Sequence, residues 1–120
     1  MTEKTIITVG GVEIPMRASA LVPRLYRVKF GRDMIRDMNN LEKKMKPAAE
    51  DGETALDAMD LTVFEDVAYI LAKHADPEVP SDPDEWLDSI PGVLSIYEAL
   101  PQILALWSRN LKTTSKPRKK

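Results

Sequence analysis

Apolar positions at the start of the chain follow a strand pattern and then change to a helical spacing. Thr5–Val9 and Val12–Met16 are rich in β-branched and apolar residues, and Gly10-Gly11 between them suits the positive φ angles of a two-residue hairpin turn. Pro15 has no amide hydrogen for a strand ladder, so we expect its strand to lie at an edge. Because an isolated hairpin is marginally stable in water, we expect this one to pack on helices or on another chain.

Two amphipathic helices are predicted next, with Gly31 ending or bending the first. Ser19 is the expected cap of the first helix. The apolar residues on one face of that helix are Leu21, Leu25 and Val28. The second helix is expected to stop before Pro47, with an exposed loop after it. Its apolar positions, at 4-3-4 spacing, are Met34, Met38, Leu41 and Met45.

The third predicted helix is the most apolar and is expected to form the centre of the core. It starts at Thr54 or at Thr62, where a capping-box pattern occurs. Its stripe runs through Leu56, Met59, Val63, Val67, Ile70 and His74. A proline-rich linker follows, in which Asp82 or Asp84 caps a brief helix. The last helix contains Pro101, which is expected to kink or divide it.

These patterns predict a mainly α fold of about four to five helices with an N-terminal β-hairpin at about residues 5–16. With 120 residues, the chain has the size of one domain. We assign the domain to residues 1–112 and a loose, flexible basic tail to residues 113–120, which have little to bury.

The composition argues against an enzyme. The chain has no cysteine and a single histidine, His74, so a His/Cys zinc site or a cysteine nucleophile has no ligands or attacking group. Neither a nucleophile elbow nor a phosphate-binding loop is found. Glu65 and Asp66 are predicted to lie on a solvated helix face. We therefore predict no catalytic, metal or cofactor site. No stretch has the apolar length of a membrane span, so we expect no membrane partner.

Charge is distributed unevenly along the chain. The net charge of −2 includes five basic residues in 112–120; without them, 12 basic and 19 acidic residues leave −7. Six basic residues and one acid lie between Arg17 and Arg36, whereas Asp76–Asp88 holds six acids and no base. The two regions can attract one another between copies, so we expect self-association, with head-to-tail contacts that high salt weakens.

The basic segment 17–36 raises a nucleic-acid alternative. A helix, Gly31 and a second helix superficially resemble a helix-turn-helix protein. However, Asp33 and Asp37 lie near the start of the second helix, where carboxylates repel phosphate, and the chain is acidic overall. A nucleic-acid-binding or regulatory protein remains the alternative function, although we consider nucleic acid the less favoured partner.

Protein binding is the preferred class of function. Methionine either fills gaps in a core or forms an adaptable surface for another polypeptide, and the sequence is compatible with both interpretations. The candidate partner-binding residues are Arg24, Arg27, Arg32 and Arg36 for charge and Met34, Met38, Leu41 and Met45 for apolar contact. The segment around Gly31 is interpreted as a structural corner, with Phe30 turned inward and Asp33 capping the next helix.

Several motifs in a fixed order resemble one known family. The segment ASALVPRLYRVKFGRDMIRDMNNL contains a Ser-x-x-x-Pro-x-x-Tyr-Arg-x-x-Phe-Gly-Arg-Asp signature, and EDVAYILAKHADPEVP and EWLDSI follow it. Together with the short β segment before them, they resemble the tail assembly chaperone family of long-tailed phages (siphophages) and prophages of Gram-positive bacteria. The resemblance covers about residues 5–112.

The resemblance implies a role in viral tail assembly. Such a chaperone binds the tape-measure protein of the bacteriophage and keeps this long helical protein soluble until tail-tube subunits polymerise around it. A longer form made by ribosomal frameshifting would recruit the tail-tube protein. The expected location is the cytoplasm of the host bacterium, and the protein is not expected in the finished virion.

Overall fold

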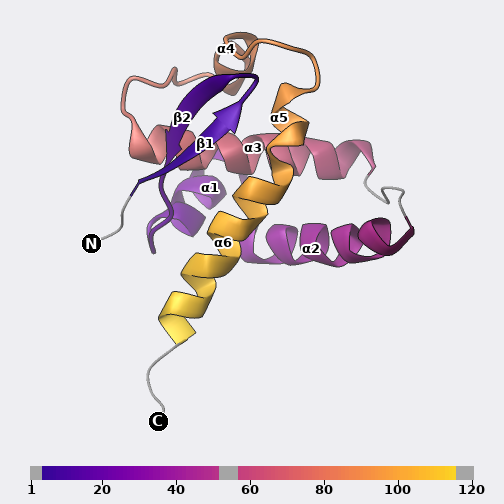
Figure 1. Cartoon of the computed structure of the whole chain (residues 1–120). Coiled ribbons are helices and arrows are strands. Elements are labelled where there is room, and N and C mark those ends of the chain that lie inside the picture. The colour runs from indigo at the N-terminus through magenta and orange to yellow at the C-terminus, as the bar shows by residue number, and fades with distance from the viewer. Residues whose placement is uncertain (1–3, 52–56, 116–120) are drawn as a thin grey trace.

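The computed structural model describes residues 4–51 and 57–115, with the backbone alone for the helix ends 45–51 and 109–115. Within these residues there are six helices and an N-terminal β-hairpin, which lies against α3, α5 and α6 (Figure 1). The predicted mainly α fold with an N-terminal hairpin is confirmed. Helix α3 lies at the centre and contacts β2 and the helices α1, α2 and α4.

The hairpin consists of β1 (Thr5–Val9) and β2 (Val12–Met16), paired antiparallel with Val9 opposite Val12. Gly10 and Gly11 form the turn with φ angles of 59° and 79°, both in the left-handed region that the two-residue turn requires. The hairpin packs on helices, as expected, because Ile7, Val9 and Met16 bury their side chains in the common core.

Helix α1 spans Val22–Phe30 and α2 spans Met34–Asp51. The predicted cap was wrong by two positions: the N-cap of α1 is Leu21, and the Ser19 hydroxyl accepts a hydrogen bond from the Leu21 amide at 3.2 Å. The predicted end of the second helix was also wrong, since α2 continues through Pro47. Proline removes one helical hydrogen bond, and the strong helix formers alanine and glutamate follow it.

Helix α3 spans Ala58–Ala75, so the predicted start at Thr62 was wrong. Its N-cap is Asp57, whose carboxylate accepts from the Asp60 amide at 2.9 Å while Asp60 accepts from the Asp57 amide at 3.0 Å. This reciprocal pair is a capping box built from two aspartates. Met59 was predicted to belong to the apolar stripe that forms the core, but its side chain is 62% exposed. The alternative start at Thr54 lies outside the described residues.

Three helices follow the linker: α4 (Pro83–Asp88), α5 (Ser95–Glu98) and α6 (Leu100–Ser115). Of the two predicted caps of α4, Asp82 is the N-cap, and it accepts a hydrogen bond from the Asp84 amide at 3.1 Å. Pro101 lies in the first turn of α6, and the last helix is divided just before it, as expected. Helix α6 continues to Ser115, three residues past the assigned domain end, and the last residues of the tail lie outside the described part.

Candidate functional site

The corner between α1 and α2 holds a hydrogen-bonded cluster of four side chains. The Tyr26 hydroxyl donates to Oδ2 of Asp37 at 2.9 Å. Arg32 reaches both groups, with Nη2 3.0 Å from the Tyr26 hydroxyl and Nε 3.3 Å from Oδ2 of Asp37. Arg32 Nη2 also donates to Oδ2 of Asp66 on α3. The cluster therefore joins the corner to the central helix.

Aromatic contacts complete this corner. The Arg32 guanidinium lies 5.3 Å from the Tyr26 ring centroid and 5.5 Å from that of Phe30, within the range of cation–π attraction. Phe30 is half-buried and packs against the core. Gly31 has φ 72°, and its amide donates to the Arg27 carbonyl at 2.8 Å. Asp33 caps α2, as its Oδ1 accepts from two amides at 3.0 and 3.3 Å.

Burial and charge shift the pKa values in this cluster. Burial raises the pKa of Tyr26 far above its ordinary value, so the hydroxyl stays protonated and available as a donor. Burial opposes the charge on Arg32, but its hydrogen bonds to Asp66 and Tyr26 raise its pKa overall. The pKa of Asp66 is also raised, because the burial of its carboxylate outweighs the attraction of Arg32. The pairing thus holds a carboxylate that is poorly solvated.

The predicted partner-binding residues separate into two groups, and the first group is directed inward. Arg32 is engaged in the corner cluster, so its predicted role as a free surface charge is corrected. Met34, Met38 and Leu41 are at most 1% exposed and form part of the core, so they offer no apolar surface to a partner. Their helical spacing served packing against α1 and α3. The Met45 side chain lies outside the described residues.

The second group lies on the surface. Arg24, Arg27 and Arg36 are exposed and form no ion pair within the described part of the chain. Leu21, the N-cap of α1, and Val28 on the helix are also exposed, at 46% and 76%. The buried face of α1 instead carries Val22 and Tyr26. We call Leu21, Arg24, Arg27 and Val28 the outer face of α1.

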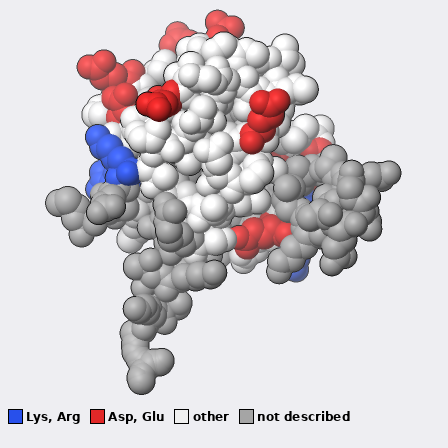
Figure 2. Space-filling view, viewed as in Figure 1, with Lys and Arg blue, Asp and Glu red and all other residues white. Residues whose placement is uncertain are grey.

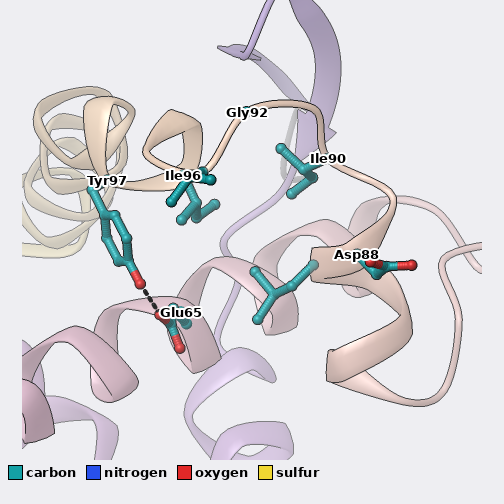
Figure 3. A pocket seen from close by; sticks show the side chains of 8 residues that line it. Glu65, Asp88, Ile90, Gly92, Ile96 and Tyr97 are labelled. Atoms are coloured by element: carbon teal, nitrogen blue, oxygen red, sulfur yellow. Dashed lines mark hydrogen bonds between the residues drawn. The ribbon is translucent and has the colours of Figure 1, made fainter.

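A shallow pocket of about 420 Å³ lies between α3, α4 and α5. Its apolar lining is Leu87, Ile90, Val93 and Ile96, and its two charged residues are Glu65 and Asp88 (Figure 3). Figure 3 shows Tyr97 on α5 directed toward Glu65 on α3, and the Tyr97 hydroxyl donates to Oε2 of Glu65. This hydrogen bond raises the pKa of Tyr97 to about 12, with a further contribution from burial.

Glu65 and Asp66 were predicted to lie on a solvated face, and that prediction was wrong. Both side chains are half-buried and serve different neighbours: Glu65 faces Tyr97 of α5, and Asp66 faces Arg32 of the corner. The sequence reasoning missed these contacts and the pocket. Adjacent acids in an otherwise apolar helix were the available signal, because such residues need partners if neighbouring elements cover them.

Acidic side chains gather over the upper part of the molecule in Figure 2, where α4 and α5 lie in Figure 1. The sequence agrees, since residues 76–108 contain seven acids and no lysine, arginine or histidine. By contrast, α1 carries three basic residues and no acid. The pocket and the outer face of α1 therefore differ in charge and share exposed apolar side chains.

In the part of the chain that the structure describes, no group of acids and histidine is arranged to hold a metal ion. None of the helices in those residues has the length and apolar character to cross a membrane. Comparison of the chain with protein-family models, curated proteins and solved structures finds no match.

Proposed function

We propose that this protein is a tail assembly chaperone that binds the tape-measure protein of a long-tailed phage or prophage. The supporting observation is the outer face of α1, where Val28 is 76% exposed on the same face as the exposed Arg24 and Arg27. Exposed apolar side chains at helical spacing that do not pack into the core are typical of a surface that binds another polypeptide. The order of motifs in residues 5–112 supplies the family expectation.

The chemistry of this face suits a long helical client. An amphipathic helix lays apolar side chains at helical spacing against an apolar strip, and Leu21 and Val28 provide such a strip two turns long. Arg24 and Arg27 on the same helix attract acidic positions that flank the client's apolar stripe. The client would be held soluble in the host cytoplasm, and a longer form of the chaperone would recruit tail-tube protein.

The nucleic-acid alternative has some support from the exposed Arg24 and Arg27. Two observations oppose it. Arg32 is occupied by Asp37 and Asp66, and the Asp33 carboxylate caps the start of α2, where a phosphate would need a free helix end. A salt series of duplex-DNA binding distinguishes the two functions, because phosphate contacts produce a steep salt dependence.

The experiment is co-expression of this chain with the tape-measure protein from the same gene cluster, followed by affinity capture and sizing of the eluate. We expect a complex in which several copies share one client. Val28→Asp places a charge in the apolar strip and should abolish co-elution. Met59→Asp changes another exposed apolar residue, 62% exposed on α3, and should leave the complex intact.

The two variants also guard against misfolding as an explanation, since both positions are exposed and thermal melting should match that of the unmodified chain. A client that precipitates while the unmodified chaperone elutes alone would contradict the proposed function. Equal loss of the client by Val28→Asp and Met59→Asp would contradict the assignment of the site to the outer face of α1.

A further inference from the structure

The pocket between α3, α4 and α5 has the character of a docking site for a polypeptide. Its apolar lining continues onto the surface, where Val93 is 90% exposed and Leu94 is 62% exposed. Its charged residues, Glu65 and Asp88, are both acidic, and among the described residues no basic side chain lines it. An occupant therefore needs apolar side chains flanked by positive charge.

The same chain presents that combination on the outer face of α1. Val28 and Leu21 supply exposed apolar side chains, and Arg24 and Arg27 supply guanidinium groups that have no ion-pair partner among the described residues. No acid occurs between Met16 and Arg32, so nothing in this segment weakens the positive charge.

We propose that the outer face of α1 of one copy docks into the pocket between α3, α4 and α5 of a second copy. In this contact Val28 packs on Val93 and the pocket lining, while Arg24 and Arg27 approach Asp88 and Glu65. Charge complementarity selects this occupant, since residues 76–108 carry only negative charge and α1 only positive charge. The contact needs no client, so its test is separate from that of the proposed function.

The position of the two surfaces sets the geometry of assembly. In Figure 1, α4 and α5 lie above the central helix α3, and α1 lies below it. One molecule therefore cannot fill its own pocket with its own α1. Each docked pair still has one free pocket and one free α1 face, so further copies add head to tail and form open chains or rings.

Where the proposed function also holds, the second copy and the client compete for the same face of α1. Without client, the outer face of α1 is then covered by the pocket of a neighbouring copy, and client binding to this face displaces the neighbour. Adding client to oligomers that the chain has formed on its own should accordingly reduce their size. Competition of this kind follows from mass action on one shared surface.

Two variants of the full chain test the contact without a client. The face variant is Arg24→Gln with Val28→Gln, which removes the charge and the apolar side chain but keeps helix formers. The pocket variant is Asp88→Lys with Val93→Lys, which makes the pocket repel α1. All four positions are exposed, so both variants should retain the melting temperature of the unmodified chain. Light scattering after size exclusion measures their mass at low and high salt.

We expect the unmodified chain to form oligomers larger than dimers that grow with concentration and shrink at high salt. Each variant alone should be monomeric. An equimolar mixture should form a 1:1 dimer, because the intact α1 face of the pocket variant can dock into the intact pocket of the face variant. No larger species should form, because the other face and the other pocket of this dimer are both altered. Met59→Asp should assemble like the unmodified chain.

Three results would overturn the proposal. One is a chain that stays monomeric at low salt up to sub-millimolar concentration. Another is assembly by either variant alone to the size reached by the unmodified chain. The third is a mixture of two monomeric variants that stays monomeric, which would show that the two surfaces do not meet.

Discussion

Nη2 of Arg32 donates a hydrogen bond to Oδ2 of Asp66, and this ion pair joins the corner between α1 and α2 to the middle of α3. The same guanidinium contacts Oδ2 of Asp37 at 3.3 Å. The two carboxylate side chains are only 15% and 14% exposed, so Arg32 compensates two poorly solvated charges at once. Arg32, the arginine of the signature segment, therefore stabilises contacts within the folded chain.

Replacing Arg32 by methionine should destabilise the protein substantially. Arg32→Met keeps most of the aliphatic length but leaves the Asp37 and Asp66 carboxylates without their cation. Breaking a buried pair in this way costs about 3–5 kcal/mol. Because the Arg32 side chain is 31% exposed, we expect the unfolding free energy to fall by about 2 kcal/mol. Urea unfolding monitored by tryptophan fluorescence measures this loss.

Arg36→Met is the matched control for this experiment. Arg36 is exposed and has no ion pair within the described residues, so its loss should change the unfolding free energy by less than about 0.5 kcal/mol. Similar losses in both variants would mean that the corner cluster adds nothing beyond a general effect of basic charge.

The hairpin turn offers a second comparison, between adjacent glycines with positive φ. A Cβ at Gly10 would lie 2.5 Å from the carbonyl oxygen of Pro91 and 2.7 Å from the Ser95 hydroxyl, whereas one at Gly11 would meet no atom of the described residues within 4 Å. Both substitutions to alanine strain the backbone by about 1 kcal/mol, and only Gly10→Ala also forces the turn away from α5.

We therefore expect Gly10→Ala to reduce the unfolding free energy by about 3 kcal/mol and Gly11→Ala by about 1 kcal/mol. Chemical denaturation of the two variants in parallel measures the difference. If both lose the same amount, the segment around Pro91 yields without cost, and close contact between the hairpin and α5 is not important for stability.

Core and surface positions on the first two helices should respond in opposite ways. Met38 is 0% exposed, so Met38→Ala leaves a cavity and should cost about 2–5 kcal/mol of unfolding free energy. Val28 is 76% exposed, so Val28→Ala should cost less than about 0.5 kcal/mol. A stable Met38→Ala variant and an unstable Val28→Ala variant would reverse the assignment of core and outer face.

The choice of face on α1 shows where prediction from sequence reached its limit. Leu21 and Val28 share one face, but Val22 and Tyr26 share another, and both sets are spaced for a helix. Periodicity identifies the helix without deciding which stripe meets the core. That decision depends on how α1 docks on α3, which involves residues about 40 positions away.

Local signals were read more successfully than distant ones. The Gly10-Gly11 turn, the Asp33 cap and the division of the last helix near Pro101 depend on neighbours in sequence, and their positions follow from backbone chemistry. The start of α3 was missed because its capping box uses Asp60 instead of glutamate or glutamine. The Arg32–Asp66 pair and the pocket require tertiary packing, which no local pattern specifies.

The single histidine predicts a dependence of stability on pH. His74 lies near the end of α3, and its Nε2 is 2.8 Å from the Ser19 hydroxyl. Burial lowers its pKa below the ordinary 6.5, and the positive charge of Arg17 lowers it further. The folded state thus favours the neutral ring, although the end of a helix would by itself favour the cation.

The sign of the effect follows from this depressed pKa. The unfolded chain binds a proton near pH 6.5, whereas the folded chain resists protonation until a lower pH. The stability contributed by neutral His74 is therefore complete above 6.5 and is lost as the pH falls through 6.5 toward the lowered folded value. Below the folded pKa the loss is constant.

His74→Gln separates this effect from the titration of carboxylates. Glutamine does not titrate and can still hydrogen-bond to the Ser19 hydroxyl. Urea unfolding at pH about 7.5 and about 5.5 should show a loss of stability on acidification that is larger in the unmodified chain than in the variant. Equal losses in the two proteins would show that His74 titrates alike in the folded and unfolded states, and would contradict the inference that burial and Arg17 keep its ring neutral.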